Sequence, residues 1–221
     1  MSSPTMMPMS LEEIAQAVQG RLIAGTAAID TPVATSTFTD SRQIVEGSVF
    51  VAIAGERVDG HDYVSKVGAQ GAVAAIVDHE IDGAGVPQIV VEDTVLALGA
   101  LAKHNIERRR ALETPFTVIG ITGSVGKTTT KDLMKALLAH IGPTIAPVGS
   151  FNNEIGLPLT SLKVHAETRF LVAEMGANHV GEIANLTSLV PPDIAVVLKV
   201  GVAHLGEFGS PERIAQAKSE I

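Results

Sequence analysis

Short apolar runs, each bounded by polar or turn-forming residues, recur along the chain and predict buried β-strands. Segments with helical spacing lie between these runs. In the second half, strand and helix alternate so regularly that the strands are expected to be parallel with right-handed crossovers. The predicted strands cover residues 21–25, 48–53, 72–77, 88–91, 116–122, 144–147, 169–174 and 194–200. This pattern is typical of an α/β fold.

Capping residues mark where the helices begin and end. Ser10 and Glu13 form a capping box at the start of the first helix, and Gly20 is expected to be its left-handed stop. Asp62 is expected to cap a second helix that reaches about residue 70. Further helices are predicted over residues 95–110, 127–140, 157–163 and 180–189, and from residue 211 onward.

The long helix over 95–110 is followed by a break in the pattern at 112–115 and then by a second series of strands and helices. We therefore predict two domains, 1–113 and 114–221. Three arginines end the long helix, at 108–110. We expect them to face solvent and the negative end of the helix dipole, rather than to form a nucleic-acid patch.

The composition narrows the function classes. The 221 residues are 46% hydrophobic but only 3% aromatic, so the core is built from Ala, Val, Ile and Leu. A net charge of −8 argues against general nucleic-acid binding, which requires a basic surface. The lack of cysteine excludes disulfides and thiolate catalysis. Because neither a signal peptide nor an apolar run of membrane-spanning length is found, we expect a cytoplasmic protein without membrane insertion.

The strongest chemical signal is the segment 120–130 (GITGSVGKTTT), which follows an apolar strand and opens a helix. In that context a glycine-rich loop is predicted to bind phosphate through its backbone N–H groups, with a lysine at the β/γ-phosphates and a hydroxyl on Mg²⁺. Ile121 stands where the strict pattern requires glycine, so the loop is a variant. The predicted ATP and phosphate ligands are Gly123, Ser124, Val125, Gly126, Lys127, Thr128 and Thr129.

Variant loops also occur in partitioning and nitrogenase-type ATPases, but these carry an additional lysine where this chain has Thr122. The loop instead resembles that of the Mur ligases, which are ATP-dependent amide-forming enzymes of peptidoglycan synthesis. The segments 152–158 (NNEIGLP) and 174–183 (EMGANHVGEI) also resemble this family. The latter is similar to the signature of the members that add D-alanyl-D-alanine to UDP-MurNAc-tripeptide, rather than to that of the tripeptide synthetases.

The resemblance implies an N-terminal α/β uridine-nucleotide-binding domain, followed by a truncated parallel-sheet P-loop ATPase domain. It also implies a reaction. ATP would phosphorylate the terminal carboxylate of UDP-MurNAc-tripeptide, and the amine of D-alanyl-D-alanine would attack the acyl phosphate. A tripeptide synthetase and a non-catalytic nucleotide-binding fragment are the alternatives. Because the family's central domain continues further and a third domain follows, we expect the chain to be an N-terminal fragment, inactive alone.

The metal-binding and catalytic residues are predicted partly from where they lie in the expected fold and partly from the resemblance. Glu174 ends a predicted parallel strand, where open α/β sheets bind ligands, and its carboxylate suits Mg²⁺ together with Thr128. The resemblance implies that His204 helps to bind a second Mg²⁺ and that Lys218 stands where some members carry a carbamylated lysine. A solvent-facing lysine is the alternative at 218. Lys127, His204 and Lys218 are the predicted catalytic residues.

The remaining predicted contacts come from the same resemblance. Asn153 is expected to position the phosphates or a metal-bound water, although a turn-forming asparagine is the alternative. Ser41, Arg42 and His61 are expected to contact the uridine diphosphate, with a surface pair between Arg42 and its neighbour Asp40 as the competitor. The role of His179, which could cap a helix or touch phosphate or substrate, is left open.

Overall fold

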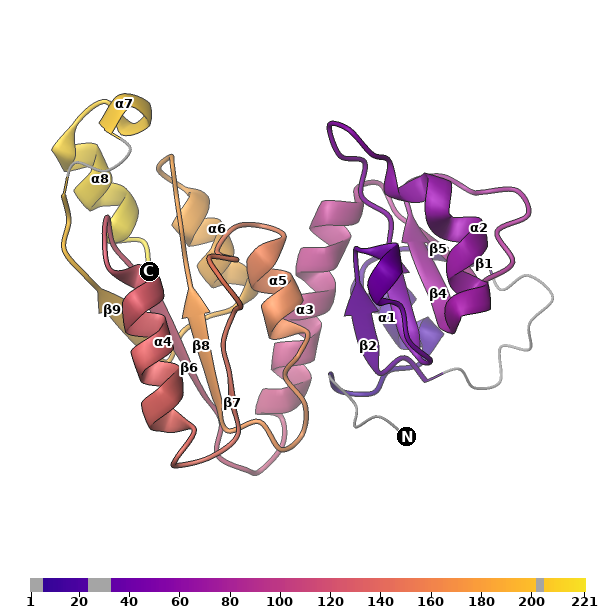
Figure 1. Cartoon of the computed structure of the whole chain (residues 1–221), viewed down its shortest axis with the longest axis horizontal. Coiled ribbons are helices and arrows are strands. Elements are labelled where there is room, and N and C mark those ends of the chain that lie inside the picture. Colours follow the sequence, from indigo (N-terminus) through magenta and orange to yellow (C-terminus); the bar gives the residue numbers. More distant parts are fainter. Residues whose placement is uncertain (1–5, 24–32, 202–204) are drawn as a thin grey trace. The chain divides into compact units, whose positions relative to one another are not determined.

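A computed structural model describes residues 6–23, 33–201 and 205–221 (Figure 1). These residues form two compact units, 1–105 and 106–221, which divide within helix α3 (Thr94–Arg110). Both units are α/β, as predicted. The domain boundary predicted between 113 and 114 stays a prediction. In the described part of the chain, every helix is too short or too polar to cross a membrane.

The first unit contains a five-stranded sheet in the order β1-β5-β4-β3-β2. Strands β2 to β5 pair in parallel, whereas β1 runs antiparallel to β5. Alternate residues of the central strands pack on helix α2, so one face of the sheet buries Phe50, Ala75 and Val77 against Val64 and Val67. The elements are α1 (Leu11–Ala17), β1 (Arg21–Ile23), β2 (Ser36–Phe38), η1 (Ser41–Gln43), β3 (Ser48–Val51), η2 (Gly60–Tyr63), α2 (Val64–Val67), η3 (Gly68–Gln70), β4 (Ala72–Val77) and β5 (Gln88–Val90).

The second unit contains a four-stranded, entirely parallel sheet in the order β7-β8-β6-β9, as the alternation of strands and helices predicted. Helix α4 packs on one face against Ile119 and Val172, while α5 and α6 pack on the other against Val118 and Leu171. The elements are β6 (Thr117–Thr122), α4 (Lys127–Leu138), β7 (Thr144–Ile145), α5 (Gly156–Ser161), β8 (Phe170–Glu174), α6 (Glu182–Leu189), β9 (Ile194–Val197), α7 (Leu205–Phe208) and α8 (Pro211–Lys218).

Two predicted helix boundaries were wrong. The residue with positive φ after α1 is Gln19, at 55°, and not Gly20. Gly20 is instead required for close packing, because a Cβ there would lie 2.6 Å from Cγ2 of Ile89. Asp62 does not cap the second helical segment. Asp59 does so, since its carboxylate accepts a hydrogen bond of 2.9 Å from the backbone N–H of His61.

The expectation that all three C-terminal arginines of α3 face solvent was also wrong. Arg109 is only 1% exposed. Its guanidinium donates hydrogen bonds to the backbone carbonyls of Thr114, Pro115 and Thr168, at distances of 2.7 to 3.3 Å. These carbonyls flank the start of β6 and the start of β8. Hydrogen bonds to backbone carbonyls therefore satisfy the N–H donors of this buried guanidinium.

Candidate active site

The phosphate loop joins β6 to α4 through residues 123–126. Gly123 and Gly126 have φ of +149° and +87°, a conformation that L side chains rarely adopt. Gly126 is the N-cap residue of α4 and has no side chain to bind the first N–H groups of the helix. Because these N–H groups and the helix dipole favour negative charge, the start of α4 suits a phosphate group.

Three polar side chains of this region meet at the ends of β6 and β8. Lys127 folds back over the loop, and its Nζ donates a hydrogen bond of 2.7 Å to the carbonyl of Gly123. The hydroxyl of Thr128 donates to Oε2 of Glu174 over 3.1 Å. Glu174 pairs in register with Ile121 of β6, and only 1% of it is exposed. The structure therefore brings Glu174 to the phosphate loop and excludes a solvent-facing carboxylate.

The second oxygen of Glu174 is held by Asn152, whose role the sequence did not predict. Nδ2 of Asn152 donates to Oε1 of Glu174 over 2.9 Å. The backbone carbonyl of Asn152 also accepts a hydrogen bond of 2.8 Å from the N–H of Gly176. A Cβ on Gly176 would lie 2.8 Å from Cγ of Asn152, so this close approach requires glycine. Because Asn152 and Asn153 are adjacent in the same motif, the sequence did not indicate which of them contacts the Glu174 carboxylate.

The adjacent Asn153 has a local role in addition to its position near the loop. Its Oδ1 accepts a hydrogen bond of 2.9 Å from the backbone N–H of Gly156, at the start of α5. This is the turn-forming function that the sequence left as an alternative. Asn153 nevertheless lines a cavity together with Lys127, so its proposed contact with phosphate is compatible with its position.

Two cavities flank the loop, and Lys127 and Asn152 line both. One, of about 340 Å³, lies toward α6 and includes Lys127, Asn152, Asn153, Gly176, Glu182 and Asn185 in its lining. The other, of about 370 Å³, lies over the loop and includes Ser124, Val125, Gly126, Lys127, Thr128, Thr129 and Glu174. These volumes are in the range of small-molecule sites.

Lys218, at the end of α8, is 2% exposed, so the alternative of a solvent-facing lysine is excluded. Its Nζ donates to the carbonyl of Ala177 over 3.3 Å, and Ala177 lines the cavity toward α6. Burial is the main reason why the pKa of the Lys218 amine lies below its ordinary value, and repulsion from Lys127 lowers it further. A lowered pKa increases the fraction of neutral, nucleophilic amine.

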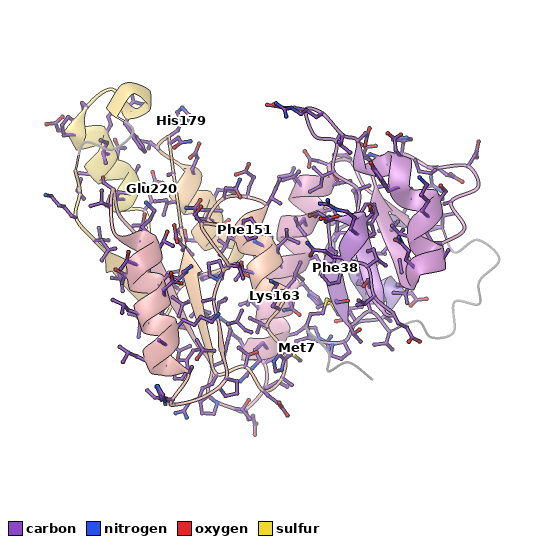
Figure 2. The ribbon with its side chains drawn as sticks, in the orientation of Figure 1. Met7, Phe38, Phe151, Lys163, His179 and Glu220 are labelled. Carbon is purple, nitrogen blue, oxygen red and sulfur yellow. The ribbon has the colours of Figure 1, made fainter. Side chains whose placement is uncertain are left out.

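His179 lies just before α6 and is exposed (Figure 2). Its Nδ1 lies 2.9 Å from Oε1 of Glu182, and the other carboxylate oxygen accepts a hydrogen bond of 2.7 Å from the backbone N–H of Asn178. Burial by itself raises the pKa of the Glu182 carboxyl, but the hydrogen bonds from Asn178 and His179 outweigh it and leave the pKa below its ordinary value. His179 thus contacts a residue that lines the cavity.

The oxygen donors beside the loop fit a magnesium ion. The Thr128 hydroxyl and the Glu174 carboxylate are hard ligands 3.1 Å apart, next to a loop suited to phosphate. Mg²⁺ is commonly bound by one or two carboxylates or hydroxyls together with substrate phosphates. The other expected metal ligand, His204, lies outside the described residues.

The residues expected to contact uridine diphosphate lie in the first unit. Ser41 and Arg42 belong to η1, directly after β2. The guanidinium of Arg42 binds both carboxylate oxygens of Asp40, at 2.9 and 2.7 Å, while its side chain is 87% exposed. This pair lowers the pKa of the Asp40 carboxyl from 3.8 to about 2. Arg42 is therefore accessible to a phosphate, but it already has a carboxylate partner.

His61 is buried, with both ring nitrogens facing carboxylates. Its Nδ1 lies 2.6 Å from Oδ1 of Asp59, and its Nε2 lies 3.2 Å from Oδ1 of Asp78. The side chain is only 5% exposed, which limits its contact with a ligand such as uridine diphosphate. The expected role of His61 in binding the nucleotide is not evident from its present contacts.

Comparison with known proteins identifies two family regions. Residues 121–221 match the Mur ligase middle domain, and residues 35–106 match the Mur ligase family, catalytic domain. A UDP-N-acetylmuramoyl-tripeptide–D-alanyl-D-alanine ligase of Mycobacterium bovis is 43% identical over 98% of this chain and 46% of its own length. The chain thus spans less than half the length of such curated relatives.

Solved structures of Mur ligases are also similar to this chain. A crystal structure of MurF from Acinetobacter baumannii superposes with a TM-score of 0.85 and 40% sequence identity, over 98% of this chain and 46% of that one. A MurF ligase from Thermotoga maritima in complex with ADP has a TM-score of 0.72 and 39% identity, over 84% of this chain and 42% of that one.

Proposed function

The chain belongs to the Mur ligase family, and we propose that it forms the nucleotide- and UDP-substrate-binding part of a ligase that joins D-alanyl-D-alanine to UDP-MurNAc-tripeptide. The proposal is supported by relatives and solved structures of that name. ATP, UDP-MurNAc-tripeptide and D-alanyl-D-alanine are the proposed substrates. Because ATP and a UDP-linked precursor are consumed together, we propose that the reaction takes place in the cytoplasm.

The phosphate loop is proposed to bind the ATP phosphates. In this proposal the backbone N–H groups of residues 123–129 bind phosphate oxygens. Lys127 would exchange its bond to the Gly123 carbonyl, now 2.7 Å long, for the β- and γ-phosphates. Its charge would then offset the negative charge that develops as the γ-phosphoryl group moves to the substrate carboxylate. The amine of D-alanyl-D-alanine would then attack the acyl phosphate, forming the amide bond as the carbon–oxygen bond to phosphate breaks and inorganic phosphate leaves.

Thr128 and Glu174 are proposed to hold Mg²⁺, with Asn152 keeping the carboxylate in place. Bound there, the ion would neutralise phosphate charge during transfer. The observation that carries the proposed function is this group: a buried carboxylate held at both oxygens, by Thr128 and Asn152, beside a glycine-rich loop that ends in Lys127. The predicted contribution of His204 to a second Mg²⁺ stays a prediction.

Lys218 is proposed to be carbamylated. Its burial and the lowered pKa of its amine favour the neutral form that reacts with CO₂. The resulting anion would lie beside Ala177, which lines the cavity toward α6, and close enough to Lys127 for their charges to interact. A carbamate signal in the ¹³C NMR spectrum of the chain equilibrated with ¹³CO₂, absent from Lys218→Met, is expected. A spectrum without that signal would refute the modification.

Nucleotide binding tests the site in this chain directly. We expect ADP to bind the 221-residue chain more tightly with Mg²⁺ than with EDTA, and we expect Glu174→Gln to remove that difference. Lys127→Met should weaken binding under both conditions. Equal affinity with and without Mg²⁺ would contradict the proposed metal site.

Ligation is tested in the full-length enzyme. We expect ADP release that depends on both UDP-MurNAc-tripeptide and D-alanyl-D-alanine, and no measurable turnover by the 221 residues alone. Release that depends on another amino acid with the UDP-dipeptide would indicate the tripeptide synthetase instead. Nucleotide binding without any release would indicate a non-catalytic module.

A further inference from the structure

Four titratable side chains gather where β4 ends in the first unit, and none of them belongs to the phosphate loop or its ligands. They are Asp59 and His61, at the start of η2, and Asp78 and His79, directly after β4. The carboxyl ends of parallel strands are where open α/β sheets bind ligands. His61 is buried, whereas the side chains of Asp78 and His79 are 40% and 62% exposed.

Three of these side chains bring a possible ligand atom close to those of the other two. Nε2 of His61 lies 3.2 Å from Oδ1 of Asp78, and Nδ1 of His79 is hydrogen-bonded to the same oxygen. All three atoms lie within 4.8 Å of one another. The two imidazole rings stack with their centroids 4.9 Å apart. Small side-chain rotations at the exposed His79 and Asp78 would bring such atoms to a common ion, because metal–nitrogen and metal–oxygen bonds are about 2 Å long.

The carboxylate of Asp59 orients the buried imidazole of His61 so that Nε2 faces Asp78. Oδ1 of this carboxylate lies 2.6 Å from Nδ1 of His61 and also accepts a hydrogen bond of 2.9 Å from the backbone N–H of His61. When Nδ1–H donates to Asp59, Nε2 carries the lone pair of the ring, and this nitrogen accepts a long hydrogen bond of 3.3 Å from the backbone N–H of Asp78. A metal ion bound at Nε2 would take the place of that hydrogen bond. A carboxylate behind a histidine is also the usual outer shell of a metal-bound imidazole.

We propose that His61, Asp78 and His79 form a binding site for a first-row divalent transition metal such as Zn²⁺. Two imidazole nitrogens and one carboxylate oxygen select such ions over Mg²⁺, which prefers oxygen ligands alone. The exposed sides of Asp78 and His79 leave a further coordination position open to water or to an anionic ligand. The site shares no residue with the proposed Mg²⁺ ligands in the second unit, but it includes His61, which was expected to contact uridine diphosphate.

The test uses the metal-free 221-residue chain without nucleotide. Co²⁺ is added and its visible absorption recorded, and Zn²⁺ is then added as a competitor. We expect a single Co²⁺ per chain with the absorption of a nitrogen-ligated, low-coordinate ion, displaced by Zn²⁺ but not by millimolar Mg²⁺. His79→Gln, at an exposed position where folding is not at risk, should weaken binding at least tenfold. Asp59→Asn, which keeps a side-chain oxygen for the cap of η2 but removes the charge behind His61, should weaken it about 10- to 100-fold.

Two further variants locate the ion. His140→Gln changes an exposed histidine of the second unit and should leave Co²⁺ binding unchanged, as should Glu174→Gln beside the phosphate loop. A chain that binds no Co²⁺ would overturn the proposal, because the hydrogen bond from the backbone N–H of Asp78 would then be the only function of Nε2 of His61 that the structure supports. Binding that survives His79→Gln and Asp78→Asn, or that is lost in Glu174→Gln, would overturn it equally.

Discussion

The side-chain amide of Asn152 donates a hydrogen bond of 2.9 Å to Oε1 of Glu174, while the backbone of Asn152 binds Gly176. The amide thus fixes the carboxylate whose other oxygen faces Thr128. Removing this bond would let Glu174 rotate away from the loop.

We therefore expect Asn152→Ala to weaken Mg²⁺-dependent ADP binding by roughly tenfold, the worth of about one hydrogen bond to a charged group. Binding in EDTA should change little. The measurement is calorimetric titration with ADP, with and without Mg²⁺. Ser188→Ala, which removes a hydroxyl bonded within α6, serves as the control. An Asn152→Ala chain with unchanged Mg²⁺ dependence would show that Glu174 is held without the amide.

Lys131 holds the loop that leads to Asn152. It lies on α4 and is 1% exposed, and its Nζ donates to the carbonyls of Pro147 and Gly149 at 3.0 and 2.9 Å. Lys131→Met keeps the length of the side chain but leaves both carbonyls without this donor. We expect it to lower the free energy of unfolding by about 2–4 kcal/mol in urea denaturation. Lys135→Met, on the exposed face of the same helix, should change it by less than about 0.5 kcal/mol.

We expect the contribution of the Asp40–Arg42 ion pair to folding stability to depend on pH. The pKa of Asp40 falls from 3.8 to about 2 because Arg42 binds its ionised form. The contribution of this pair to stability is therefore complete above pH 3.8 and is lost as the pH falls toward 2. In a ¹³C NMR titration, we expect Arg42→Gln to move the Asp40 midpoint upward toward 3.8. Arg57→Gln, at another exposed arginine of this unit, should leave it in place. An unmoved midpoint in Arg42→Gln would show that another group stabilises the carboxylate.

We expect a larger side chain at position 20 to destabilise the packing against β5 and the residue after it. A Cβ at this position would lie 2.6 Å from Cγ2 of Ile89 and 2.9 Å from Cγ1 of Val91, both on buried side chains. We expect Gly20→Ala to lower the free energy of unfolding by about 1–3 kcal/mol in urea denaturation. In α7, no atom of the described residues beyond the neighbouring backbone lies within 4 Å of a Cβ at position 206, so Gly206→Ala should be neutral or slightly stabilising. If both variants were equally stable, β5 would have to move aside at no cost.

Most of the fold could be predicted because its signals are local. Strand β4 occupies residues 72–77 as predicted, since a run of apolar residues between two turns specifies a buried strand without knowledge of its partners. The last helix also begins at residue 211 as predicted, and the Ser210 hydroxyl caps it by accepting a hydrogen bond from the backbone N–H of Arg213. The errors at Gly20 and Arg109 arose where neighbours distant in sequence determine the role, whereas at Asp62 the nearby Asp59 forms the cap instead. Close contact with Ile89 requires glycine at position 20, and the carbonyl of Thr168 binds the guanidinium of Arg109.

The sequence by itself determined the α/β architecture, the phosphate loop and the family, because each depends on residue types at short, fixed spacings. Only the tertiary structure decided that Asn152 rather than Asn153 holds Glu174, that Lys218 is buried against Ala177, and that His61 meets Asp78. Thr128 and Glu174 are separated by 46 positions, yet their oxygens lie 3.1 Å apart. Such contacts depend on strand register and on how loops close over a sheet, which are set by the packing of the whole unit and not by any one segment.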